Sequence, residues 1–192
     1  MPGGGSAAAI AGALGASLVG MVAELTIGRP DAVEREDVLR QVRDAAATLR
    51  TELLDLAESD AAAYDAAMAA RRLPKTTDEE RARRAWQMHH TILEAARVPL
   101  ETARRARDVL DLAVRIAPIG NRNAISDAGV AAQLASAAVR GAVLNVRINL
   151  PYLPADEPLR HEAAHEASML EAAALQREDE VLSAVSLLLG EG

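Results

Sequence analysis

GNRNAISDAGVAAQLASAAVRGAVLNVRINL, residues 120–150, is the stretch that decides the fold of this chain. It begins with Gly-Asn-Arg-Asn, which predicts a turn because Gly and Asn accept backbone angles that other residues resist. Ser126 is placed to cap the helix that follows, since its side-chain oxygen can accept a hydrogen bond from a first-turn amide. Asp127 comes next, at the positive end of the helix dipole, where a carboxylate is favoured.

The helix predicted after Asp127 consists mostly of Ala, Gly, Val and Leu, so neighbouring backbones can approach it closely. Near its far end, Asn145 and Asn149 lie one turn apart on the same face. Polar side chains in such an apolar segment need hydrogen-bonding partners. A bound ligand is one source of those partners.

The composition of the chain favours close-packed helices over a sheet. Half of its 192 residues are apolar, yet only 2% are aromatic, whereas sheets are enriched in Val, Ile, Tyr and Phe. The length leaves room for a sizeable core, and no low-complexity linker divides the chain. We therefore expect a single all-α domain over residues 1–192.

Charge and cysteine content exclude several classes of function. The net charge of −7 and the isoelectric point near 5.2 argue against nucleic-acid binding, which relies on neutralising phosphates. The absence of cysteine excludes disulfides, thiolate metal sites and a cysteine nucleophile. No basic segment precedes the first apolar run, so we expect no secretory signal and a cytoplasmic location.

Residues 2–27 form an apolar, Gly-rich segment that is compatible with three structures. Its small residues recur every fourth position and suit close helix crossing, as in a membrane span or in a helix buried against another helix or subunit: Ala8, Gly12, Ala16 and Gly20. Ala and Gly add little hydrophobicity and Glu24 ends the run, so no membrane span is expected. Free amides at the helix N-terminus can also hold an anion, and the residues that would supply them are Gly3, Gly4, Gly5 and Ser6.

A long amphipathic helix is predicted from Asp31 to just before Leu73-Pro74, because the residue before a proline is pushed out of the helical region. Asp60 lies in the middle of its apolar stripe. A carboxylate facing the core is costly unless something pairs with it. Asp60 is therefore either bonded to another helix or to Tyr64, or it faces a cavity where chemistry takes place.

Thr77 and Glu80 form a capping box that opens a third helix, predicted to end near Arg97. Its inward stripe includes His89, either a hydrogen-bonded core histidine or a ligand. A fourth helix is expected to restart at Pro99, which is tolerated in a first turn. It carries a basic cluster that is either a solvated face or a site for an anionic ligand tail: Arg104, Arg105 and Arg107.

The last predicted helix, residues 156–189, contains a His-Glu-Ala-Ala-His motif that matches the zinc-binding pattern of metalloproteases. Both His161 and His165 fall roughly opposite the apolar stripe of that helix, so they should face water. No metal site is expected there. The complete pattern predicts a compact all-α bundle of about six helices, dimeric through the small-residue stripes of the first and fifth.

Several short motifs, each weak alone, come in one order along the chain: residues 2–9, 25–29, 73–75 with 77 and 79–80, 98–100, 120–121 with 123, 126–132, and 141–142 with 145–146 and 148–150. Together they resemble the cyclodeaminase/cyclohydrolase family of one-carbon folate metabolism. The resemblance implies an all-α homodimer that binds a tetrahydrofolate derivative in a groove formed by these loops and helix ends. Members carry a short helical segment before the Gly-rich motif, which we expect to be missing here because Met1 directly precedes Pro2.

The resemblance implies one of two reactions, neither of which demands a metal or a redox cofactor beyond the folate itself. A cyclodeaminase closes 5-formimino-tetrahydrofolate to 5,10-methenyl-tetrahydrofolate with loss of ammonia, and this is the activity we expect first. A cyclohydrolase, the alternative, adds water to the methenyl form to give 10-formyl-tetrahydrofolate. A catalytically silent helical dimer is a further alternative.

Site residues follow from that chemistry as hypotheses. Asp127 and Asp60 are the expected acid/base or charge-stabilising pair, because a cationic methenyl bridge favours nearby carboxylates. Lys75 is expected to donate a proton or to hold the glutamate carboxylates. The candidates for contacts to the pterin or to an anionic group are Asn121, Asn123, Asn145, Ser126, Ser6 and the amides of Gly3, Gly4 and Gly5. Alternatively, Ser126 and Asp127 only cap a helix.

Overall fold

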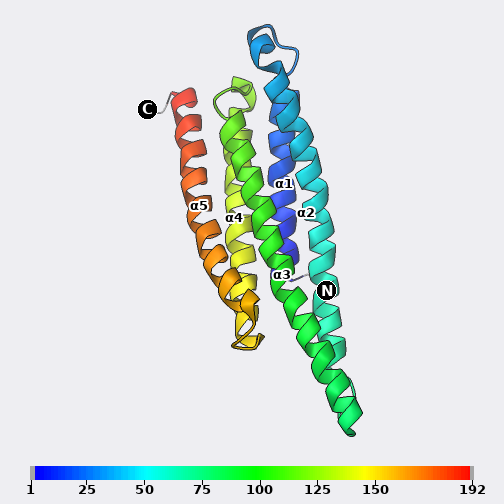
Figure 1. Cartoon of the computed structure of the whole chain (residues 1–192). Helices are drawn as coiled ribbons and strands as arrows, with labels where there is room; N and C mark the ends of the chain where they lie inside the picture. Colours follow the sequence, from blue (N-terminus) through cyan, green and yellow to red (C-terminus); the bar gives the residue numbers. More distant parts are fainter. Residues whose placement is uncertain (1–2, 191–192) are drawn as a thin grey trace.

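The computed structural model describes residues 3–190, which form five α-helices and three short 3₁₀ helices without a strand (Figure 1). Met1 and Pro2, on which the expected loss of an N-terminal helix rests, lie outside the described residues. The α-helices are α1 (Gly4–Glu24), α2 (Glu36–Arg71), α3 (Asp78–Ile116), α4 (Ile125–Asn149) and α5 (Pro158–Leu189). The 3₁₀ helices are η1 (Pro30–Arg35), η2 (Arg122–Ala124) and η3 (Leu150–Tyr152). The all-α prediction is confirmed.

Helix α4 is the centre of the bundle, because it packs against α1, α3 and α5. Its Ala and Val side chains fill the core, and Ala135, Ala138 and Val139 are fully buried. A Cβ atom at Gly15 of α1 would lie 3.0 Å from the Ala131 carbonyl oxygen. The α1 and α4 backbones therefore approach each other as closely as the small residues of the sequence predicted.

The small-residue stripe of α1 packs against other helices of the same protomer, which corrects the prediction that it forms a dimer contact. Ala16 is fully buried, and a Cβ at Gly12 would touch side chains of both α2 and α4. The face of α1 that remains exposed carries larger apolar side chains instead, among them Ile10 and Leu14. Small residues were needed where two neighbouring helices of the same chain meet α1.

Two segments, Gly4–Glu24 and Arg122–Tyr152, are long and apolar enough to cross a membrane by length and composition. In each, 56% of the most apolar window is buried inside the bundle. Packing against the other helices therefore accounts for their apolar composition.

Helix α3 runs unbroken through Pro99, so the two helices predicted on either side of it are one helix of 39 residues. Proline inside a helix removes one backbone hydrogen bond, but tertiary packing can outweigh that cost. Pro99 is buried and Leu100 beside it is only 3% exposed, which ties the segment to the core. The predicted start is confirmed, since Thr77 and Glu80 form a reciprocal capping box.

The C-terminal part of α2 and the N-terminal part of α3 extend beyond the ends of α4 and α5 (Figure 1). Side chains there lack a second layer to pack against. Trp86 is 65% exposed and stacks on His90, and His89 is also exposed. The inward stripe predicted for this part of α3, with His89 as a core histidine, is therefore wrong.

The His-Glu-Ala-Ala-His motif of α5 points outward as predicted, because His161 and His165 are both exposed. Within residues 3–190, no group of three or more His, Asp or Glu side chains is arranged to hold a metal ion. The basic cluster of α3 is occupied by carboxylates. Arg104 makes two 2.6 Å bonds to Glu166 of α5, which raises the pKa of Arg104 and lowers that of Glu166.

Candidate active site

A cavity of about 510 Å³ opens where the N-terminus of α1 meets the C-terminal half of α2 and the end of α4. This volume lies within the range of small-molecule sites. Its wall contains Gly3, Gly4, Gly5, Asp60, Ala63, Tyr64, Ala67, Met68, Arg71, Ala95, Asn145, Ile148, Asn149 and Tyr152. Five of the residues predicted for the site, Gly3 to Gly5, Asp60 and Asn145, thus lie together.

Asp60 is fixed at the N-terminus of α1. Its Oδ2 atom accepts hydrogen bonds from both the Ser6 amide and the Ser6 hydroxyl, each at 2.8 Å. Ser6 is buried, so these bonds satisfy two polar groups that water cannot reach. The anion expected at the Gly-rich helix start is therefore a side chain of the same protein, and Ser6 holds this carboxylate instead of a ligand.

Gly5 makes room for that carboxylate. A Cβ atom at this position would lie 2.2 Å from Asp60 Oδ1 and 2.8 Å from Oδ2, so any side chain would displace the acid. No donor among the described residues bonds to Oδ1. The acid therefore keeps one oxygen free on a wall of the cavity while the other is held in place.

Amide side chains of α4 also line this cavity. Asn145 donates from Nδ2 to the Gly141 carbonyl oxygen at 2.8 Å, one helical turn earlier. Its amide also faces Gly4, where an added Cβ would come within 3.3 Å of Nδ2. Because Gly4 has no side chain, the Asn145 amide has room at the wall of the cavity.

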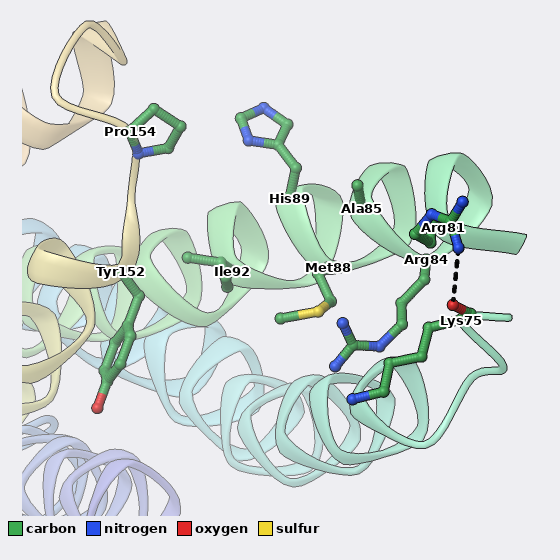
Figure 2. A pocket seen from close by; sticks show the side chains of 9 residues that line it. All are labelled: Lys75, Arg81, Arg84, Ala85, Met88, His89, Ile92, Tyr152 and Pro154. Atoms are coloured by element: carbon green, nitrogen blue, oxygen red, sulfur yellow. Dashed lines mark hydrogen bonds between the residues drawn. The ribbon is translucent and has the colours of Figure 1, made fainter. Parts of the chain in front are cut away.

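A second cavity of about 490 Å³ adjoins the first, because Tyr152 lines both. Its wall is formed by Lys75, Arg81, Arg84, Ala85, Met88, His89, Ile92, Tyr152 and Pro154. Figure 2 shows the Lys75 ammonium and the Arg84 guanidinium directed into the space beside Met88. We refer to this second cavity as the cationic trough.

Three of the cations that line the two cavities have no carboxylate partner among the described residues. Within residues 3–190, no carboxylate lies within ion-pair distance of Lys75 or Arg84, or of Arg71 in the first cavity. The Arg84 Nε atom is buried and lacks a hydrogen-bond partner in the same part of the chain. Three unneutralised cations on a protein of net charge −7 point to an anionic ligand group.

The remaining predicted residues lie at the opposite end of the bundle. Asp127 and Asn145 are 18 positions apart on α4, which places them about 27 Å apart along the helix. Asp60 and Asp127 of one chain therefore share no cavity, and their pairing within a protomer is corrected. The reason is that α1 and α4 run antiparallel. The Gly-rich N-terminus of α1 therefore lies beside the C-terminus of α4, whereas Asp127 lies at the N-terminus of α4.

Local contacts explain the Asn-rich turn at this far end. Asn121 donates to the Leu25 carbonyl oxygen, receives a bond from the Asn123 amide, and donates its own amide to Thr26. It ties the turn to the end of α1 and lines neither of the two cavities described above. Ser126 is exposed inside the first turn of α4, whose N-cap is Ala124, so its predicted capping role is wrong.

Sequence reasoning did not assign Arg71 or Tyr152 to the site. A signal for Arg71 was present, because Asp60, Tyr64, Ala67 and Arg71 recur at helical spacing along one face of α2. Tyr152 had no such signal. It follows the end of α4 in η3, and only the folded position of that turn brings it to the wall of both cavities.

The fold and the site define a class of protein: an all-α bundle with a half-open cavity that offers a fixed carboxylate and amides beside a cationic trough. Such a site suits a small molecule with a polar ring and an anionic tail. The formiminotransferase-cyclodeaminase family model matches residues 1–169. The chain belongs to this family and is a folate one-carbon enzyme of the cyclodeaminase/cyclohydrolase type.

Similar proteins of known activity fall into two groups. The chain is 50% identical over 148 residues to the methenyltetrahydrofolate cyclohydrolase of Methylorubrum extorquens, covering 77% of this chain and 71% of that protein. It is 36% identical over 169 residues to the mouse formimidoyltransferase-cyclodeaminase, covering 88% of this chain but only 31% of the mouse protein. It thus spans about a third of the length of that relative.

A solved structure shares the fold. The crystal structure of formiminotetrahydrofolate cyclodeaminase from Thermotoga maritima superposes with a TM-score of 0.85 at 28% identity. The match covers 98% of this chain and 89% of the other. The helical architecture is therefore common to proteins that carry the cyclodeaminase name and to this chain.

Proposed function

We propose that the protein is a methenyltetrahydrofolate cyclohydrolase, which converts 5,10-methenyl-tetrahydrofolate and water to 10-formyl-tetrahydrofolate. The observation that supports this choice is the 50% identity to a cyclohydrolase, against 36% to a cyclodeaminase. The cyclohydrolase, given as the alternative from the sequence, therefore replaces the cyclodeaminase as the proposed reaction. Both reactions pass through a tetrahedral adduct at the same bridging carbon, so one scaffold serves either.

Asp60 is the group we assign to water activation. Water adds its oxygen to the bridging carbon, the bond from that carbon to N5 breaks, one water proton passes to N5 and the other to solvent. The free Oδ1 atom of Asp60 can accept a proton from the attacking water, while the bonds from Ser6 hold Oδ2 still. Its negative charge also favours the cationic methenyl substrate in the cavity.

The cationic trough fits the glutamate end of the substrate. Tetrahydrofolate joins its pterin to a glutamate that carries two carboxylates, and the two cavities adjoin at Tyr152. Lys75 and Arg84 are the groups proposed to bind these carboxylates. The pterin then occupies the cavity with Asp60 and Asn145.

The function proposed here includes a homodimer. Exposed apolar side chains cover the outer faces of α1 and α4, which pack side by side: Ile10, Leu14, Met21, Val130, Leu144 and Ile148. A second copy that packs antiparallel on these faces places its Asp127 end against the Asp60 end of the first. The antiparallel arrangement also keeps the two Asp127 carboxylates apart, whereas a parallel one brings like charges together. Asp127 keeps its proposed role only across this interface.

The reaction is tested by following the absorbance of 5,10-methenyl-tetrahydrofolate. A cyclohydrolase removes it faster than the spontaneous rate, and Asp60→Asn should lower kcat about 100-fold or more, the usual contribution of a general base. Release of ammonia from 5-formimino-tetrahydrofolate, with no acceleration of methenyl hydrolysis, would instead identify a cyclodeaminase. An Asp60→Asn enzyme with full activity refutes the role of this acid.

The role of Asp127 across the interface is tested by mixing variant subunits. Asp60→Asn and Asp127→Asn are each expected to be inactive, but random exchange of subunits gives mixed dimers with one intact site. About a quarter of the unaltered activity should return in an equal mixture. If activity stays absent after exchange, or if Asp127→Asn is fully active alone, the partner does not supply Asp127.

A further inference from the structure

Pro99 leaves one backbone carbonyl of α3 without its helical partner. In an α-helix each carbonyl accepts from the amide four residues later, and proline has no amide hydrogen. The carbonyl that Pro99 leaves free is that of Ala95, which lines the first cavity. A carbonyl in such a position needs another donor.

Asn149, the last residue of α4, supplies that donor. Its Nδ2 atom donates to the Ala95 carbonyl oxygen at 2.8 Å and to the Asn145 carbonyl oxygen at 2.9 Å. These two bonds use both hydrogens of the amide nitrogen. Because each neighbour is an acceptor, the amide nitrogen must face them and the amide oxygen must face away.

The orientation of Asn149 leaves its Oδ1 atom as a fixed acceptor in the cavity. Asn149 is half-buried and lines the cavity, and no donor in residues 3–190 bonds to Oδ1. A reduced pterin carries N–H donors at its 2-amino group, N3 and N8. We infer that Asn149 is a substrate-binding residue whose Oδ1 accepts one of these N–H groups, and that the amide keeps this orientation through its bond to the Asn145 carbonyl whether or not Pro99 is present. The inference rests on the proposed function.

A purely structural role for Asn149, tying α4 to α3, makes different predictions. The tie is made by Nδ2, whereas the contact to the ligand is made by Oδ1. Pro99→Ala returns an amide hydrogen to the Ala95 carbonyl, so the tie matters less in that background. The loss of ligand binding caused by removing Oδ1, in contrast, should be the same with Pro or Ala at position 99.

The test compares Asn149→Ala, Pro99→Ala and the double variant, by urea unfolding and by calorimetric binding of 5-formyl-tetrahydrofolate. Asn149→Ala should weaken binding about 10-fold or more in both backgrounds, as expected when one buried hydrogen bond is lost. Its effect on the unfolding midpoint should be smaller in the Pro99→Ala background than in the protein that keeps Pro99. A binding loss that disappears in the Pro99→Ala background overturns the inference and leaves only the tie.

Ligand analogues identify the donor. Three analogues replace the 2-amino group, the N3 hydrogen or the N8 hydrogen, and one of them should bind equally to the unaltered protein and to Asn149→Ala. If Asn149→Ala weakens the binding of all three analogues as much as it weakens the binding of 5-formyl-tetrahydrofolate, Oδ1 is not the acceptor. Absence of 5-formyl-tetrahydrofolate binding by the unaltered protein overturns the proposed function and this inference together. Binding that Asn149→Ala leaves unchanged overturns the inference alone.

Discussion

Replacing Gly5 with alanine should destabilise the protein, although Gly→Ala in a helix is normally favourable by about 1 kcal/mol. The added Cβ would lie 2.2 Å from Asp60 Oδ1. Ordinary contact begins near 3.5 Å, so the carboxylate must retreat by about 1 Å. Its two 2.8 Å bonds to Ser6 cannot survive that movement.

The magnitude follows from what the movement leaves behind. Ser6 is 1% exposed, so its amide and hydroxyl would both be buried without a partner. Each such group costs about 1–3 kcal/mol. After the gain from alanine, a net loss of about 1–5 kcal/mol remains, which lowers the Tm of a domain of this size by roughly 2–20 °C.

Gly20→Ala is the matched control for Gly5→Ala. It lies in the same helix, and its Cβ would meet only the Ala46 Cβ at 3.6 Å, an ordinary contact. Circular dichroism during heating and urea unfolding should show Gly20→Ala as stable as the unaltered protein or more so. If Gly5→Ala is equally stable, the carboxylate does not occupy the position described here, and the account of Asp60 fails.

Three further predictions concern charge and assembly. The bond from Arg104 lowers the pKa of Glu166, so this pair stabilises the fold above about pH 4.3, the unfolded pKa, and the contribution is lost as pH falls through the lower folded value. The pair is partly exposed, so unfolding of Glu166→Gln should show a deficit of at most about 1 kcal/mol at pH 7 that shrinks as the pH falls below the unfolded pKa and is absent below the folded one. A deficit that persists in strong acid contradicts this. Lys75→Gln should raise KM for the methenyl substrate about 3- to 10-fold with kcat retained, while Arg83→Gln, the same loss of charge outside the trough, should not. Leu144→Glu, at a side chain 64% exposed on α4, should give a monomer by light scattering; Met169→Glu, 60% exposed on α5, should leave the dimer intact, and equal masses would place the interface elsewhere.

Sequence patterns located those features of the site that depend on neighbours along the chain. The capping box at Thr77 and the outward direction of His161 were predicted correctly, since both depend on spacing within one helix. The apolar stripe that holds Asp60 was found for the same reason. Patterns failed at Pro99, where burial of the segment outweighed the tendency of proline to end a helix.

The sequence by itself determined an all-α protein of the cyclodeaminase/cyclohydrolase family, because helical periodicity and short motifs are properties of consecutive residues. Only the tertiary structure decided which polar residues share a cavity. Asp60 of α2 and Asn145 of α4 meet because both helices run antiparallel to α1, and the same direction carries Asp127 about 27 Å away along α4. The position at which two helices pack determines which group pairs with a buried carboxylate. The spacing of residues along the chain does not specify that position.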